Sequence, residues 1–143
     1  MSKLDIDRFN DECKCISVGK LSKEQIELIV KNRPDLETVL KTKNILMWEN
    51  RLEYIEKHSR NFAYGDFEKY IEDIPEIISK PDYIGIPPHD LSIQFIKCYN
   101  DNVLVAVRVA ADGKLSFRTM YSITNSQLAD YEKKNRIWKV NKD

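Results

Sequence analysis

The chain has 143 residues, with 23 basic and 23 acidic side chains and a formal net charge of zero. This length is enough for one domain with a sizeable core. The overall field of a neutral protein does not draw it onto nucleic acid, so any such contact needs a local basic patch. The composition therefore argues against a general DNA-coating protein.

Short motifs exclude several other classes. The N-terminal residues are polar, and no run approaches the roughly 20 apolar residues of a membrane span. Three cysteines leave an odd one, and Cys13 and Cys15 lie too close together to favour a bridge, so we expect a reduced, cytoplasmic protein. With His58 and His89 as the two histidines and no phosphate-binding glycine motif, neither a metal site nor a cofactor is expected.

The N-terminal part of the chain predicts two strands and a capped helix. Residues 15–21 have the composition of a short strand, and Ser22 with Gln25 forms a capping box that begins a helix ending before Pro34. Residues 38–40 and 44–48 are apolar, strand-like runs. A second helix is predicted at 49–59, with Leu52 and Ile55 on its buried side and Tyr54 as a further candidate for that side. Trp48 and Trp138 fit the core or an interface, and we favour the core for both.

The rest of the chain predicts one more helical segment, a sheet and a final helix. Asp66 caps a helix that restarts at Pro75 and ends at Pro81, and residues 83–88 are extended. Strands are predicted at 92–100, 103–111 and 114–123 from their β-branched and aromatic residues. A helix from Asn125 or Ser126 to Asn135 and an edge strand at 137–140 follow. We predict a single α+β domain over 1–143, with N-terminal helices packed on a small antiparallel meander and a C-terminal helix and tail at 124–143.

The turns of the meander predict its register. Asp112-Gly113 is a strong signal for a two-residue hairpin loop, and Asp101-Asn102 is a weaker one. These loops would pair Arg108 with Phe117 and with Phe95, and the remaining predicted pairs are Ala106–Thr119, Leu104–Tyr121, Lys97–Ala106 and Tyr99–Leu104. Because directly opposed residues share a face, a valine column would be buried on one side. The other face would carry Phe95, Lys97, Tyr99, Leu104, Ala106, Arg108, Phe117, Thr119 and Tyr121.

The cations on that second face have two interpretations. A half-buried arginine needs a partner, and Arg108 could pair either with a carboxylate of the protein or with an exogenous phosphate. Arg118 is predicted to lie at the rim. His58 falls near a helix end, where a cation is favourable through the dipole alone, and Arg51 lies two turns before it on the same helix face.

Three segments resemble a known family: 18–22, 49–58 and 74–84, the last reading Ile-Pro-Glu-Ile-Ile-Ser-Lys-Pro-Asp-Tyr-Ile. The chain, over about residues 16–123, resembles the phage-associated branch of the barnase–EndoU–colicin E5/D–RelE-like nucleases. This resemblance implies helices on a small antiparallel sheet and metal-independent cleavage of RNA. It implies a toxin-like ribonuclease of phage or prophage type that acts on RNA, such as tRNA or another structured RNA. It also admits a cognate immunity or antitoxin protein as a partner.

Such a reaction needs a base, an acid and donors to the phosphate. His58 matches the Lys/Arg-His helix end of the family and would be the base or the acid. From the predicted geometry, Lys97 and Arg108 would stabilise the phosphate, while Thr119 and Tyr121 would donate hydrogen bonds.

We assign Arg51, Tyr54 and Arg118 to substrate binding.

One position departs from the family pattern. Relatives often carry a second histidine in an Arg-x-x-His-Ile motif, and here Tyr54 holds that position. Tyrosine is a poor base near neutral pH. The alternative function is therefore a catalytically degenerate member that binds RNA or a protein.

Overall fold

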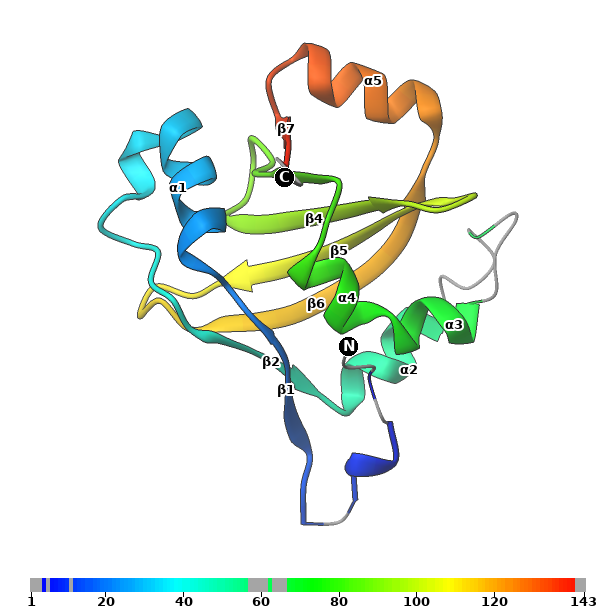
Figure 1. The fold of residues 1–143 in the computed structure, drawn as a ribbon. Helices are drawn as coiled ribbons and strands as arrows, with labels where there is room; N and C mark the ends of the chain where they lie inside the picture. Colours follow the sequence, from blue (N-terminus) through cyan, green and yellow to red (C-terminus); the bar gives the residue numbers. More distant parts are fainter. Residues whose placement is uncertain (1–3, 5, 11, 57–61, 63–66, 141–143) are drawn as a thin grey trace.

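The computed structural model describes residues 4, 6–10, 12–56, 62 and 67–140. In this part of the chain, seven strands form one sheet in the order β1-β2-β6-β5-β4-β3-β7 (Figure 1). The strands are β1 (Cys15–Lys20), β2 (Asn44–Trp48), β3 (Tyr83–Gly85), β4 (Ser92–Cys98), β5 (Asn102–Val109), β6 (Leu115–Ile123) and β7 (Ile137–Lys139). Neighbouring strands are antiparallel except for β2 and β6, which are parallel. The predicted α+β class is confirmed, with a larger sheet than the meander alone.

Helices α1, α4 and α5 begin at signals that the sequence carries. The helices are α1 (Lys23–Asn32), α2 (Asn50–Glu56), α3 (Phe67–Glu72), α4 (Ile74–Ser79) and α5 (Asn125–Lys133). Ser22 and Gln25 form the predicted capping box of α1, and Thr124 and Gln127 form a second one at α5. Pro75 lies in the first turn of α4, where its missing N–H leaves no intrahelical bond unmade.

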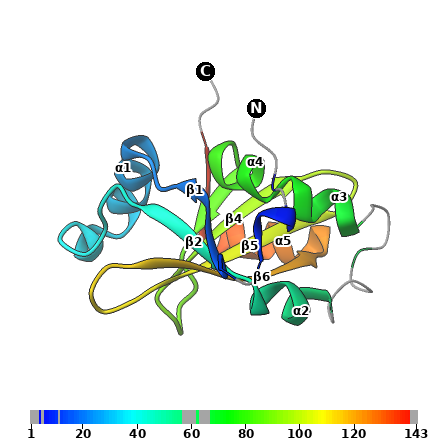
Figure 2. The same cartoon turned by 90° about the horizontal axis from the view of Figure 1, so that it is seen from below.

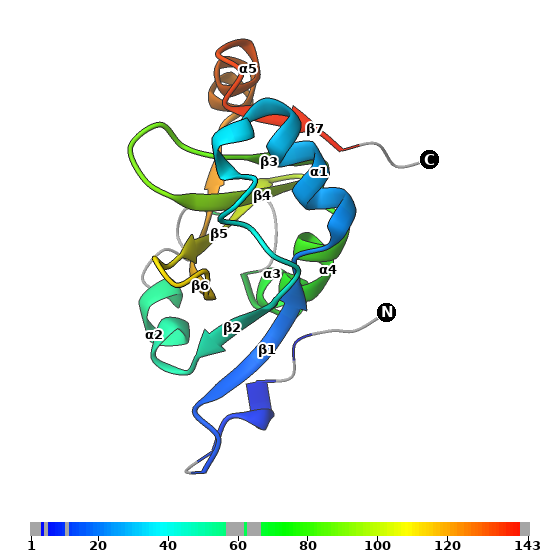
Figure 3. The ribbon, with the colours of Figure 1, turned by 90° about the vertical axis from the view of Figure 1, so that its left-hand side faces the viewer.

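The helices are divided between the two sides of the sheet. Helices α1, α3 and α4 lie on one side, whereas α2 and the loop between β3 and β4 project from the other (Figures 2 and 3). None of the helices in the described ranges is long and apolar enough to cross a membrane.

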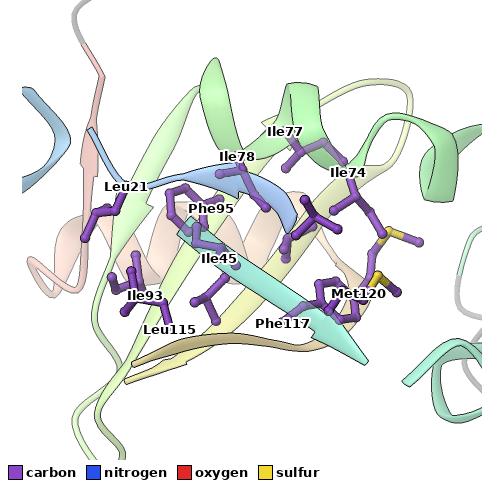
Figure 4. Close-up of a cluster of buried hydrophobic side chains, with 14 of the residues drawn as sticks. Leu21, Ile45, Ile74, Ile77, Ile78, Ile93, Phe95, Leu115, Phe117 and Met120 are labelled. Atoms are coloured by element: carbon purple, nitrogen blue, oxygen red, sulfur yellow. The ribbon is translucent and has the colours of Figure 1, made fainter. Parts of the chain in front are cut away.

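We call the side under α1, α3 and α4 the core face of the sheet. Its strand residues are almost fully buried against the isoleucines of α4 (Figure 4), and they include Ile45, Ile93, Phe95, Val105, Val107, Leu115, Phe117 and Met120. This is the predicted valine side, and its burial is confirmed. Removing this apolar surface from water is the main stabilising contribution to the fold.

We call the opposite side, which carries Gln94, Ala106, Arg108, Thr119 and Tyr121, the open face. A smaller apolar cluster under α5 covers one end of it, built from Ile96, Leu104, Ala106, Ile123 and Ile137 with Leu128 and Tyr131 beside them. The other end carries the polar residues that the next subsection describes.

The predicted register of β4 against β5 is wrong. Ser92, not Phe95, lies opposite Arg108, and the turn between the strands has three residues, because Cys98 pairs with Asn102. Asn102 belongs to the strand, where its buried amide donates to the Ile123 carbonyl oxygen (3.2 Å). A turn signal in the sequence thus marks a buried polar residue, and Phe95 moves to the core face.

The hairpin between β5 and β6 differs from the predicted register in two ways, and the two shifts compensate each other. Its loop has three residues, 111–113, with Gly113 at a φ of 87°, and Ala110 donates to the Lys114 carbonyl oxygen (2.9 Å). A β-bulge then adds one residue to β6 at Arg118. Beyond the bulge the predicted pairs Ala106–Thr119 and Leu104–Tyr121 are confirmed, whereas Arg108 lies opposite Ser116 instead of Phe117.

Other local expectations differ as well. Residues 38–40 form a turn rather than a strand, and Trp48 and Tyr54 are 50% and 41% exposed rather than buried. Trp138 is buried as predicted. Residues 57–59 of the predicted second helix lie outside the described part of the chain.

Candidate functional site

A cleft of about 560 Å³ lies on the open face, where α2 approaches β6. We call it the arginine cleft, and it is lined by Trp48, Asn50, Arg51, Asp90, Arg108, Ser116, Phe117 and Arg118. Its walls come from β2, α2, the β3–β4 loop, β5 and β6. The chain is neutral overall, yet three of these eight residues are arginines, so the cleft is the local basic patch that nucleic-acid binding would require.

The bulge in β6 forms one wall of the cleft. At a bulge the extra residue leaves the regular ladder, so its backbone groups need other partners. The Arg118 carbonyl oxygen accepts two hydrogen bonds from the Arg51 guanidinium, through Nε (2.8 Å) and through Nη2. The Arg118 side chain reaches across to an ion pair with Asp90. Arg51 and Asp90 therefore hold the bulge from two sides.

Arg108 lies in a row of paired residues that crosses β4, β5, β6 and β2 on the open face. It is exposed and sits between Ser92 on β4 and Ser116 on β6, and Ser116 continues the row to Leu46 on β2. Within the described residues, no carboxylate forms an ion pair with the Arg108 guanidinium. Of the two interpretations of Arg108, its lack of a described protein partner favours the exogenous anion.

The next row of the open face holds buried polar atoms. Gly85, Gln94, Ala106 and Thr119 lie side by side across β3, β4, β5 and β6. Thr119 Oγ1 and Gln94 Oε1 are buried with no hydrogen-bond partner among the described residues. Buried polar groups are nearly always satisfied by protein, water or ligand, so each of these two oxygens has the capacity for a further hydrogen bond.

Tyr121 follows Thr119 on the same face. Burial raises the pKa of its phenol, and the nearby Tyr131 raises it further, while Arg118, Arg136 and hydrogen bonding with Gln94 act in the opposite direction. A raised pKa keeps the hydroxyl protonated at neutral pH. Tyr121 can therefore donate a hydrogen bond but cannot serve as a base.

Two exposed aromatic side chains flank the arginines. Trp48 lines the cleft, and the Tyr54 ring lies under the Arg51 guanidinium, 4.3 Å from ring centroid to Cζ. Exposed rings next to arginines are the usual platform for stacking unpaired bases.

The structure brings together most of the predicted site residues. Arg51, Arg108 and Arg118 line the cleft, and Tyr54 contacts Arg51. Thr119 pairs with Ala106 and Tyr121 pairs with Leu104. Ala106 and Leu104 alternate with Arg108 along β5, so Thr119 and Tyr121 lie on the same face as Arg108. His58 lies outside the described residues, and its role stays a prediction.

Lys97 is not part of this group. It pairs with Val103 on the core face, at the end of β4 away from Ser92, and its Nζ donates to the Lys80 carbonyl oxygen (3.0 Å). The expectation that Lys97 and Arg108 share a face is therefore wrong. The cause is the three-residue turn, which shifts β4 against β5 by an odd number of residues.

The cleft also contains residues that sequence reasoning did not select. Asp90 follows the exposed His89 in the β3–β4 loop, and Asn50 begins α2. Only the adjacent Pro87-Pro88 and the helix start mark these positions in the sequence. Across the described ranges, no group of three or more His, Cys, Asp or Glu residues is arranged to hold a metal ion.

Comparison with protein families gives one match. The model of the family described as phage-Barnase-EndoU-ColicinE5/D-RelE like nuclease3 matches residues 18–130. The chain belongs to this nuclease family. The match runs from the second half of β1 to most of α5 and includes every residue that lines the arginine cleft. The searches of curated proteins and of solved structures gave no match.

Proposed function

We propose that this chain is a metal-independent endoribonuclease that cleaves RNA by attack of a ribose 2′-hydroxyl on the adjacent phosphate. The observation that carries the proposal is Arg108, an exposed guanidinium that lines the arginine cleft and that no described carboxylate pairs with. Membership of the nuclease family supports a phosphodiester as the group that fills this position.

The proposed reaction forms a bond from the 2′-oxygen to phosphorus and breaks the bond from phosphorus to the 5′-oxygen. A base takes the 2′-hydroxyl proton, and an acid supplies a proton to the leaving oxygen, so the products are a 2′,3′-cyclic phosphate and a 5′-hydroxyl. We assign His58 to one of these two steps on the family pattern.

The charge that develops on the phosphate oxygens needs fixed donors. Arg108 supplies a guanidinium fork, which matches phosphate geometry. We also assign to the same group the Thr119 hydroxyl, which has no described partner, and the Tyr121 phenol, which keeps its proton. Preorganised donors of this kind contribute most where they meet charge that develops in the transition state.

The substrate in this proposal is RNA with unpaired nucleotides, as in the loops of tRNA or another structured RNA. Trp48 and Tyr54 offer exposed rings beside the arginines, and stacking on such rings requires bases that are not paired. A cognate immunity or antitoxin protein belongs to the same proposal, and it would have to cover the arginine cleft.

The test is cleavage of total tRNA and ribosomal RNA by the purified protein in the presence of EDTA, with analysis of the fragment ends. We expect discrete fragments that end in a 2′,3′-cyclic phosphate, and their loss in R108A and in H58A. Cleavage that requires a divalent cation, or that survives in both variants, would contradict the assignment.

His89 provides the matched control because it is the second histidine of the chain and lies in the β3–β4 loop next to Asp90. We expect H89A to retain cleavage. Loss of cleavage in H89A with retention in H58A would move the acid–base role to this loop. Intact RNA that nevertheless binds the wild-type protein in a salt-dependent way would favour the degenerate binding module.

A further inference from the structure

A second hollow lies on the open face next to the arginine cleft. We call it the lysine hollow. Its volume is about 470 Å³, and it is lined by Lys20, Thr42, Lys43, Asn44, Leu46, Lys114 and Leu115. None of the described residues that line it is acidic. The family resemblance and the proposed catalytic group assign nothing to these residues.

The hollow and the cleft are directly adjacent across the β2–β6 junction. Leu46 lines the hollow and pairs with Ser116, which lines the cleft. Leu115 of the hollow precedes Ser116 in β6. A chain that leaves the cleft along this junction therefore enters the hollow without crossing another element.

The local structure holds the three lysines at one end of the sheet. Lys20 is opposite Asn44 in the β1–β2 pair, and Leu21 donates to the Lys43 carbonyl oxygen (3.0 Å). The Lys43 ammonium reaches the β5–β6 turn, where a Cβ added to Gly113 would lie 3.2 Å from its Nζ. Lys114 follows that turn directly.

Within the described ranges, Asp112 is the carboxylate that forms an ion pair with one of these cations. Asp112 lies 3.8 Å from the Lys114 ammonium, and its pKa is lowered by the N–H of Lys114 and by the charges of Lys114 and Lys43. A single aspartate cannot neutralise three lysines, so the hollow keeps a net positive charge. Exposed ammonium groups on flexible stems bind phosphates as point charges and carry no sequence information.

We propose that the lysine hollow binds the phosphodiester backbone of a single-stranded polynucleotide that extends from the arginine cleft. This proposal rests on the proposed function, because it assumes that the reacting phosphate lies in the arginine cleft. The hollow then holds the neighbouring phosphates, and the enzyme favours long single strands over short ones.

The test separates binding from cleavage by using an oligonucleotide that cannot react. We would measure binding of fluorescein-labelled 2′-O-methyl RNA, as a dinucleotide and as a mixed-sequence decanucleotide, to the wild type and to K20Q/K43Q/K114Q. The control K31Q/K69Q/K133Q removes the same charge from exposed positions on α1, α3 and α5.

We expect the hollow variant to bind the decanucleotide on the order of 10- to 100-fold more weakly at 0.1 M salt, with the slope of log K against log salt reduced by roughly 2. Dinucleotide binding should change little, and the control triple should resemble the wild type for both probes. This result would support the proposal even if no RNA is cleaved. A lack of cleavage would contradict the proposed function but not the binding role of the lysine hollow.

Three outcomes would overturn the proposal. One is an unchanged affinity for the decanucleotide in the hollow variant. The second is an equal loss for both probes or in both triple variants, because the effect would then come from the cleft or from net charge. The third is the absence of decanucleotide binding to the wild type. A circular dichroism melt of each variant confirms that the folded protein is being compared.

Discussion

The Arg51 guanidinium donates to the main-chain carbonyl oxygen of Arg118, at 2.8 Å from Nε. These residues are 67 positions apart, one in the first turn of α2 and the other at the bulge of β6. The bond ties a helix that follows β2 to the strand that carries Thr119 and Tyr121. Arg51 thus holds one wall of the cleft in place, and its assignment to substrate binding stays a prediction.

Replacing Arg51 should therefore lower activity through geometry as well as through charge. A lysine keeps the charge but cannot make two hydrogen bonds to one carbonyl oxygen. The charge-assisted hydrogen bond from Arg51 to the Arg118 carbonyl oxygen contributes about 1.5–3 kcal/mol. Its loss in R51K and in R51M should therefore lower kcat/KM roughly tenfold or more. RNA cleavage rates measured beside thermal melts would check this. Wild-type activity in R51K would show that Arg51 acts through its charge alone.

Arg108 should contribute to the rate with little effect on stability. Its side chain is exposed, and R108A removes no ion pair among the described residues. We expect kcat to fall by about 10²- to 10³-fold, the cost of removing one preorganised donor, with an unchanged melting temperature. R33A, which breaks the exposed Arg33–Asp35 pair, is the matched control. An equal loss in R33A would point to a general effect of charge.

Trp48 should contribute to binding of unpaired RNA. Its indole is 50% exposed and lines the cleft. Stacking contributes about 1–3 kcal/mol per base, so W48A should weaken binding of single-stranded RNA by roughly 5- to 150-fold. W48F keeps a ring and should retain most of the affinity. Fluorescence anisotropy with uncleavable RNA measures both variants, and equal affinities of W48A and the wild type would exclude this role.

Two buried tyrosine–aspartate pairs predict a loss of stability at high pH. Tyr70 donates to Asp101 (2.9 Å), Tyr99 donates to Asp73 (3.1 Å), and the two rings lie 5.1 Å apart. Burial and these hydrogen bonds to the carboxylates raise the pKa of Tyr70 from 10.0 to about 12, and burial together with Asp73 raises that of Tyr99 further.

Because the folded pKa lies above the unfolded value, the stabilisation is complete below pH 10 and is lost as pH rises towards 12. The free energy of unfolding should therefore fall over this range, and less steeply in Y70F. Denaturant titrations between pH 8 and pH 12 measure this dependence. The exposed Y54F serves as the control, and a Y70F curve parallel to the wild type would contradict the assignment.

Gly85 should tolerate no side chain. A Cβ there would lie 2.4 Å from the Arg136 carbonyl oxygen and 2.5 Å from Ile137 Cγ2. G85A should thus push β7 away from β3 and destabilise the fold by about 1–3 kcal/mol or more, as overpacking does. Thermal melts test this, with G19A as the comparison, because a Cβ at Gly19 would lie 3.0 Å from Ile78 Cγ2 and would not meet backbone within 3.0 Å. A melting temperature equal to the wild type would show that β7 can move without cost.

Local signals in the sequence were sufficient for most elements of this fold. The capping box at Ser22, the restart at Pro75 and the alternation of the meander strands each act within a few residues, so they can be read from the chain directly. The sequence did not reveal that β1 and β2 join the meander, because the parallel β2–β6 pair connects residues about 70 positions apart.

The wrong placement of Lys97 in the candidate site has one source. Asp101 and Asn102 resemble turn residues, yet both are buried and bonded to distant groups, Tyr70 and Ile123 respectively. Burial of that kind depends on tertiary structure, and misplacing the turn moved Lys97 onto the wrong face. Thr119 and Tyr121 were placed correctly because the longer hairpin loop and the bulge at Arg118 compensate each other.

The junction between β2 and β6 has a consequence for how the protein responds to heat. Only two residue pairs join these strands in the described sheet, Ile45 with Leu115 and Leu46 with Ser116, whereas β5 and β6 share eight. Short pairings open most readily in native proteins, through local fluctuations that leave the rest folded. Such opening would carry Trp48 and α2 away from Arg108 and Ser116. The protein should lose its activity reversibly on mild warming, at temperatures where the meander still gives the signal of a folded sheet.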